Sequence, residues 1–214
     1  MRITLLSLCF FLTLSLQSQS SSYQKELDVL VTEMQTEFSS SEEAIKQAEA
    51  FEQLTYSETP NWLAFYYTSY SYVMAAFLEP NPKVIDKLAQ KAQSTLDGMD
   101  ISDQDESEIY CLKSLITSAL ILADPNTRGM KYGMESSALL NKAKAANPDN
   151  PRVYLIEGQG LLYMPAEYGG GCNSAIPLLQ IALEKYNTYA PKGDLYPNWG
   201  KDEVVQLLAN CKSN

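Results

Sequence analysis

The sequence predicts an all-α protein, a TPR-like right-handed solenoid of antiparallel helix pairs with a C-terminal capping helix. Apolar residues recur at helical spacing along most of the chain, as they do on one face of an amphipathic helix. Several of these runs begin with a polar residue followed by proline, a pair that favours the first turn of a helix. No segment shows the sustained alternation of apolar and polar residues that is typical of a β-strand.

The stretch from Asn147 to Tyr186 shows this pattern most clearly. Asn150 and Pro151 begin its first helix, the residues MPAEYGGG form a glycine-rich reversal, and a second helix runs to Tyr186. Small residues at fixed positions let two antiparallel helices approach closely. The large and small positions of a tetratricopeptide (TPR) unit are filled here by Tyr154, Gly158, Leu161, Leu179 and Ala182.

Residues 1–20 differ from the rest of the chain. Arg2 precedes an apolar run, and small residues at Ser18 and Ser20 are suited to cleavage before Ser21. We expect a signal peptide over 1–20, a single TPR-like helical domain over 21–214, and a periplasmic location. No later apolar segment is long enough to predict a membrane span in the mature protein. Cleavage would remove one arginine and no acid, which takes the net charge from −10 to −11.

The composition excludes several kinds of function. Histidine is absent, which removes His-based activation of a nucleophile and every His-ligated metal site. The cysteines after residue 20 form no CxxC pair. An acidic chain without a basic stripe is not suited to nucleic acid. We therefore expect no catalytic residue, no cofactor and no metal ligand, and a binding protein rather than an enzyme.

Two helices are expected at the start of the mature chain. The first runs from Ser22 to Phe38 and has an apolar face at helical spacing. Ser40 followed by Glu43 is a capping box, which opens the second helix.

The next two helices are expected to begin at Thr59-Pro60 and Asn81-Pro82. Gly98 would end the second of them. The helix from Pro60 to Leu78 is aromatic nearly all round. Such a helix is covered on both sides, or one of its faces lines a pocket.

An acidic loop precedes the helix expected from Glu106 to Ala123. The acids suit the positive end of the helix dipole, and a calcium site is the alternative. Asp124-Pro125 then opens a segment that we interpret as a loop or broken turn. Gly129 and Gly133 support this interpretation, because each glycine costs about 1 kcal/mol inside a helix. A regular helix resumes near Glu135.

The last part of the chain predicts a reversal and a cap. Gly169–Gly171 indicates a tight turn with positive φ, and anion binding by its N–H groups is the alternative. Ser174 is the expected N-cap of the next helix, with Pro177 in its first turn. After a polar, proline-containing connection, a helix from Lys201 to Cys211 would cover the open end of the stack.

A set of short motifs carries a family resemblance. The chain has Arg-Gly-x-Lys-Tyr-Gly at 128–133, Asn-Pro-Arg at 150–152, Pro-x-x-aromatic-Gly-Gly-Gly at 165–171 and Trp-Gly at 199–200. Over about the C-terminal half, the set resembles a largely uncharacterised group of exported TPR proteins of Gram-negative bacteria. A more distant likeness is to the periplasmic TPR component of TRAP-type transporters. The resemblance implies a TPR-like fold and a periplasmic location, and no catalytic residue.

In TPR-like stacks the first helix of each pair lines a concave groove. Counted from Trp62, Tyr110 and Tyr154 as the in-frame positions, the groove would be an apolar trough with tyrosine hydroxyls and one arginine at its edge. Its residues are Leu63, Tyr67, Tyr70, Leu115, Arg152, Leu155, Gln159 and Leu162. Tyrosine offers large contact area with few rotors, which suits an interface. The alternative is that the same side chains fill a core between helix layers.

Cys172 and Cys211 are the expected disulfide. The periplasm is oxidising, and the bridge would hold the capping helix against the last regular helix pair. Cys111 lies in the middle of a helix and would remain a buried thiol.

The main functional hypothesis is a periplasmic TPR-like scaffold that engages a protein or peptide partner through the Tyr-rich groove, without catalysis. The alternative is a periplasmic small-molecule carrier or transport accessory protein, like the TRAP component, whose Tyr-rich helix faces a closed pocket. An enzyme that uses paired carboxylates is a further alternative, since acids are plentiful.

Overall fold

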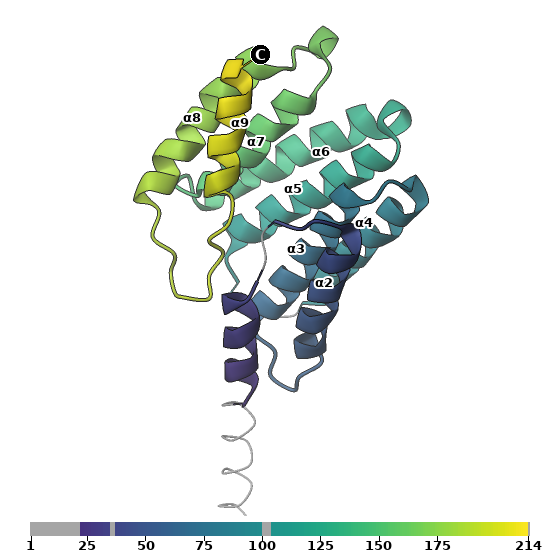
Figure 1. The fold of residues 1–214 in the computed structure, drawn as a ribbon, viewed down its shortest axis with the longest axis vertical. Coiled ribbons are helices and arrows are strands. Elements are labelled where there is room, and N and C mark those ends of the chain that lie inside the picture. Colours follow the sequence, from purple (N-terminus) through teal and green to yellow (C-terminus); the bar gives the residue numbers. More distant parts are fainter. Residues whose placement is uncertain (1–21, 35–36, 100–103, 214) are drawn as a thin grey trace, which may run out of the picture.

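The computed structural model describes residues 22–34, 37–99 and 104–213, so the signal peptide expected over 1–20 lies outside them. These described residues are helical with no strand, which confirms the all-α class. A helix over 22–32 is followed by α2 (Ser41–Thr55), α3 (Trp62–Leu78), α4 (Pro82–Asp97), α5 (Glu106–Ala123), α6 (Pro125–Ala146), α7 (Pro151–Tyr163), the 3₁₀ turn η1 (Ala166–Tyr168), α8 (Cys172–Thr188) and α9 (Lys201–Ser213). Figure 1 shows successive antiparallel helices, with α9 lying along α7 and α8. In this described part, none of the helices has the length and apolarity needed to span a bilayer.

Most helices begin where a polar side chain caps them. Asn81 Oδ1 accepts from the N–H of Lys83 at 3.0 Å, and Asn150 Oδ1 accepts from the N–H of Arg152 at 3.0 Å. Asp105 caps α5 in the same way. Each cap satisfies one of the N–H groups that lack a partner in the first helical turn, which is why these starts could be predicted.

Three predicted boundaries are wrong. The first helix ends at residue 32, well before Phe38. The third begins two residues after the predicted Pro60, because Asn61 is the N-cap and accepts from the N–H of Leu63 at 2.9 Å. The last regular helix begins at Cys172, since Gly171 with φ +106 is its N-cap, and Pro177 therefore lies inside the helix.

The segment after Asp124 is a helix and not the predicted loop. Helix α6 is continuous from Pro125, and Asp124 caps it by accepting from the N–H of Thr127 at 3.3 Å. Arg128 of α6 forms an ion pair with Asp86 of α4, and its Nη2 donates to Asp86 Oδ2 at 3.0 Å. The cap alone contributes about 1 kcal/mol, so these contacts offset much of the cost of the glycines.

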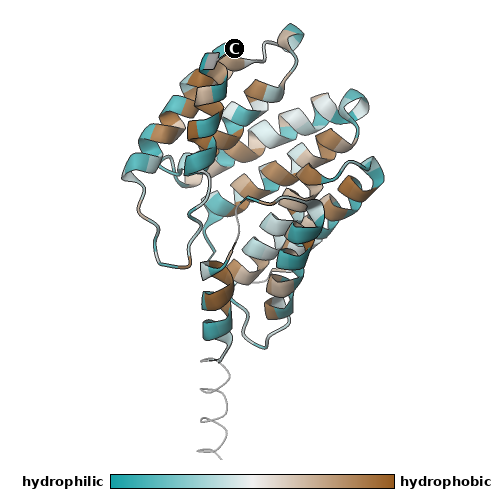
Figure 2. Ribbon diagram, in the orientation of Figure 1, coloured by the Kyte–Doolittle hydropathy of each residue, from teal (hydrophilic) through white to brown (hydrophobic). Residues whose placement is uncertain are grey.

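The core is organised around α3, which is buried nearly all round. Helices α2, α4 and α5 pack against it. The connection from α8 to α9, residues 189–200, runs back over the inner helices, and we call it the strap. Figure 2 shows the strap in mostly hydrophilic colours, yet its Trp199 is buried. Gly200 ends the strap with φ +104, where a Cβ would collide with the Tyr186 hydroxyl.

Candidate functional site

The predicted groove is filled by the strap. Six of its residues are at most 5% exposed (Leu63, Tyr67, Tyr70, Leu115, Arg152 and Leu155), while Gln159 and Leu162 are half-buried. Tyr67 donates its hydroxyl to the carbonyl of Leu195 at 2.7 Å, and the rings of Tyr70 and Trp199 lie 5.0 Å apart. Most of the side chains that were expected to form an open trough therefore lie in the core, because apolar residues of the strap pack against them.

Arg152, expected at the edge of that groove, is the centre of a buried polar network. Its guanidinium forms a salt bridge with Glu108 of α5 at 2.8 Å, and Nη1 donates to the carbonyl of Trp199 at 3.2 Å. Trp199 Nε1 donates to the Tyr66 hydroxyl at 2.9 Å, and Tyr66 donates to Glu108 at 3.1 Å. Burial raises the pKa of Tyr66 well above its ordinary value. All of these bonds are internal, so the network holds the strap in place.

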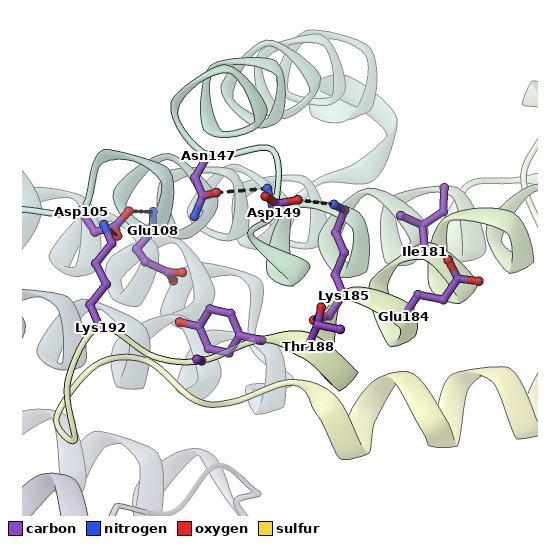
Figure 3. Close-up of a pocket in the computed structure, with 11 residues that line it drawn as sticks. Asp105, Glu108, Asn147, Asp149, Ile181, Glu184, Lys185, Thr188 and Lys192 are labelled. Atoms are coloured by element: carbon purple, nitrogen blue, oxygen red, sulfur yellow. Dashed lines mark hydrogen bonds and ion pairs between the residues drawn. The ribbon is translucent and has the colours of Figure 1, made fainter.

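A polar cleft of about 670 Å³ lies beside this network, between the end of α8, the strap and the start of α5. Figure 3 shows Lys185 and Lys192 extended into it; Lys185 pairs with Asp149 at 2.9 Å and Lys192 with Asp105 at 2.6 Å. Its other lining residues are Glu108, Asn147, Ile181, Glu184, Thr188, Tyr189 and Ala190. The volume suits a small molecule, but four carboxylates and a single large aliphatic side chain do not suit an apolar or anionic one.

A second feature is an unfilled space beside three helical glycines. At Gly129 and Gly133 of α6 and at Gly160 of α7, nothing outside the local helix lies within 4 Å of the position that a Cβ would occupy. Each glycine costs roughly 1 kcal/mol relative to alanine in a helix, and the packing in this structure does not require it. Glycine at such positions lets another group approach the backbone closely.

The glycines are flanked by exposed apolar side chains. Met130 and Met134, one turn apart on α6, are 83% and 71% exposed, and Tyr163 at the end of α7 is 74% exposed. Figure 1 shows α6 and α7 diverging from the loop that joins them. We give the name open face to the exposed positions Gly129, Met130, Gly133 and Met134 of α6 together with Gly160 and Tyr163 of α7.

Charges of both signs stand beside the open face, with Lys131 next to Met130 and Glu135 next to Met134. Lys131 follows Met130 and forms no ion pair within the described part of the chain, whereas Arg128 is paired with Asp86. Lys131 also lies over the ring of Tyr132, with its Nζ 5.0 Å from the ring centre.

The structure offers few groups for metal chemistry. Within the ranges that it describes, no group of three or more Cys, Asp or Glu side chains is arranged to hold a metal ion. Burial raises the pKa of the Cys111 thiol well above its ordinary value, so it stays protonated. Cys172 and Cys211 are joined by a disulfide, with Cα atoms 5.4 Å apart.

Sequence reasoning missed the open face because it read Gly129 and Gly133 as helix breakers. The repeated Gly-Met pair in the segment GMKYGM, four residues apart, was the available signal. On a helix this spacing places both glycines on one side and both methionines beside them.

The described part of the chain is thus an all-α protein in which the predicted groove is filled and three apolar side chains on α6 and α7 are exposed. The HusA haemophore from Porphyromonas gingivalis is a similar solved structure, with 34% sequence identity, a TM-score of 0.74, and an alignment that covers 91% of this chain and 92% of that chain. The chain therefore belongs to the family of the HusA haemophore. The family-model and curated-protein comparisons gave no match.

This likeness corrects the main functional hypothesis. A scaffold that engages a protein or peptide through a Tyr-rich groove is wrong, because the related structure is that of a haemophore and because the strap fills the groove. The comparisons favour the alternative, a carrier of a small molecule. They give no link to TRAP-type transporters or to a TPR family model.

Proposed function

We propose that this protein binds haem, or a closely related tetrapyrrole, on the open face and carries it without changing it chemically. The observation that supports this most strongly is the likeness to the HusA haemophore, which extends over 91% of the chain. A haemophore is by its name a protein that carries haem. Haem is the cargo in this proposal, and the protein has no catalytic role.

The open face fits the shape of such a ligand. A tetrapyrrole is a flat, wide and largely apolar ring, which needs a surface free of protruding side chains. Gly129, Gly133 and Gly160 supply such a surface, because a ring can lie against bare helix backbone there. Met130 and Met134 can follow the outline of the ring, because methionine is flexible and its sulfur is polarizable. Tyr163 can add a ring contact from α7.

One positive charge beside the open face, that of Lys131, fits as well. The propionates of haem are carboxylates, and Lys131 lies beside the open face with no ion pair in the described chain. The polar cleft fits less well, because Asp105, Glu108, Asp149 and Glu184 line it. A dianionic ligand would be repelled there.

The remaining expectations from the sequence belong to the same proposal. We infer that residues 1–20 export the chain and that residues 21–214 act as one domain in the periplasm. The Cys172–Cys211 disulfide supports an oxidising compartment. A TPR-like packing of α7 on α8 is supported by Gly158, whose Cβ position lies 2.9 Å from Leu179 Cδ2.

The test is a haem titration of the purified protein, followed by the change in haem absorbance and by quenching of tryptophan fluorescence. Met134→Glu should weaken binding about tenfold or more, since it places a charge where the apolar ring would lie. Gly133→Trp should block the open face.

Ile181→Glu is the matched control, because Ile181 is 37% exposed on α8 and lines the polar cleft. It should leave the affinity unchanged. If Ile181→Glu loses binding and Met134→Glu keeps it, the ligand occupies the cleft. If the parent protein shows no saturable binding, the proposed function is wrong. Far-UV circular dichroism checks that every variant is folded.

A further inference from the structure

Two methionines differ from all the others that the structure describes. Met130 and Met134 are 83% and 71% exposed, and Met164 follows at 39%. Met34, Met74 and Met99 pack against the core. A methionine sulfur is oxidised more readily the more accessible it is. The two methionines most open to solvent, among those that the structure describes, are therefore the ones beside Gly129 and Gly133.

We propose that Met130 and Met134 form a peroxide-sensitive modification site, and that their conversion to methionine sulfoxide lowers the affinity of the open face for its ligand. The effect on affinity rests on the haem-binding function proposed above. The modification itself rests only on the exposure of the two side chains.

The chemistry is a two-electron oxygen transfer from hydrogen peroxide. The lone pair of the thioether sulfur attacks one peroxide oxygen, the O–O bond breaks, and the sulfur gains that oxygen while the other leaves as water. The sulfoxide is polar and chiral, and methionine sulfoxide reductases return it to the thioether. Two apolar, deformable side chains beside Gly133 thus become polar ones that a tetrapyrrole ring would have to desolvate.

The fold should survive this change. Both side chains point into solvent, and neither belongs to the buried core. Oxidation of Met74 on α3 would instead place a polar group against that core. Accessibility therefore separates a change that acts on the open face from one that damages the protein.

The experiment treats the full chain with limiting hydrogen peroxide and follows each methionine by peptide mass spectrometry. Sulfoxide should appear first at Met130 and Met134, with the thermal midpoint unchanged. The affinity for haem should then fall roughly tenfold, and MsrA with MsrB should restore it. The double variant M130L/M134L should bind haem before and after the treatment with equal affinity, while M164L should respond to peroxide as the parent does.

Three outcomes would overturn the proposal. The first is that Met34, Met74 or Met99 is oxidised before the exposed pair. The second is that full conversion of Met130 and Met134 to the sulfoxide leaves haem affinity unchanged. In that case the proposed function stands, and the proposed effect of oxidation on binding is wrong. The third is that untreated protein binds no haem, which removes the proposed function and the switch together.

Discussion

Arg152 and Glu108 form a two-point ion pair in the interior of the protein. Arg152 Nε lies 2.8 Å from one carboxylate oxygen of Glu108 and Nη2 lies 2.8 Å from the other, and the two side chains are 0% and 4% exposed. Asn150, which caps α7, also donates to Glu108 at 2.8 Å. The pair thus joins α7 to α5. Arg152 also donates to the carbonyl of Trp199, and this bond holds the strap over the residues that were expected to line an open groove.

Breaking this pair should destabilise the fold strongly. Glu108→Gln removes the negative charge and leaves Arg152 buried without compensation, which costs about 3–5 kcal/mol. Urea unfolding at neutral pH measures the loss. Lys185→Met is the matched control: it removes a pair whose Asp149 side chain is 88% exposed, and such pairs contribute at most about 1 kcal/mol. A loss below 1 kcal/mol for Glu108→Gln would show that the charges are solvated.

Two glycines one helix apart should respond to alanine in opposite ways. Gly133→Ala should stabilise the protein by about 0.5–1 kcal/mol, because it restores helix propensity and its Cβ meets open space. Gly158→Ala should destabilise it by about 1–3 kcal/mol, because its Cβ would lie 2.9 Å from Leu179 Cδ2 in a packed core. The urea midpoints of the two variants measure these effects. If Gly158→Ala stabilised the protein, the close packing of Gly158 against Leu179 would be wrong.

The parts of the fold that the sequence predicted are those with a local cause. The starts of α4, α5 and α7 each depend on a side chain that caps an N–H two residues later, at Asn81, Asp105 and Asn150. The course of the strap has no such cause. The hydrogen bond from Tyr67 to Leu195 joins residues 128 apart in the chain. The strap sequence is polar and contains proline, and nothing in it predicts that these residues pack over the expected groove.

The open face could not be predicted from the sequence for a related reason. Gly129 and Gly133 have low helix propensity. A prediction that uses only neighbouring residues therefore expects a loop at these positions. In the structure the ion pair from Arg128 to Asp86 and the cap at Asp124 hold α6 in a helix across both glycines. Asp86, the partner of Arg128, is 42 residues away in the chain. This long-range ion pair, the local cap and the packing of α6 on α5 together support a helix across a segment of low helix propensity.

The Cys172–Cys211 disulfide should hold α9 against the start of α8. It closes a loop of 39 residues, for which the chain-entropy model predicts a contribution of about 3–4 kcal/mol. We expect a reducing agent to lower the free energy of unfolding of the parent protein by about that amount, which appears as a lower urea midpoint. The double variant C172S/C211S should start at the lower midpoint and show no response to the reducing agent. A response in that variant would point to Cys111 and contradict the assignment.

Alkaline pH should unfold the protein through its buried tyrosines. Burial raises the pKa of Tyr66, Tyr67, Tyr70 and Tyr186 above the ordinary value of 10.0. Above pH 10 the unfolded chain releases these protons while the folded chain keeps them. The stability they contribute is therefore fully present below pH 10 and is lost as the pH rises toward the folded-state pKa values, by about 1.4 kcal/mol per pH unit for each tyrosine.

The measurement is a titration from about pH 9 to 12 that follows tyrosinate absorbance and far-UV circular dichroism in the same sample. Part of the tyrosinate signal should appear only together with the loss of helical signal, because these four hydroxyls ionise when the core opens. Tyr67→Phe removes one titrating group. The free energy of unfolding of this variant, taken relative to its own value at pH 8, should therefore fall less steeply above pH 10 than that of the parent protein. Complete ionisation of the tyrosines with the helical signal intact would mean that α3 is open to solvent, and the filled groove would then be wrong.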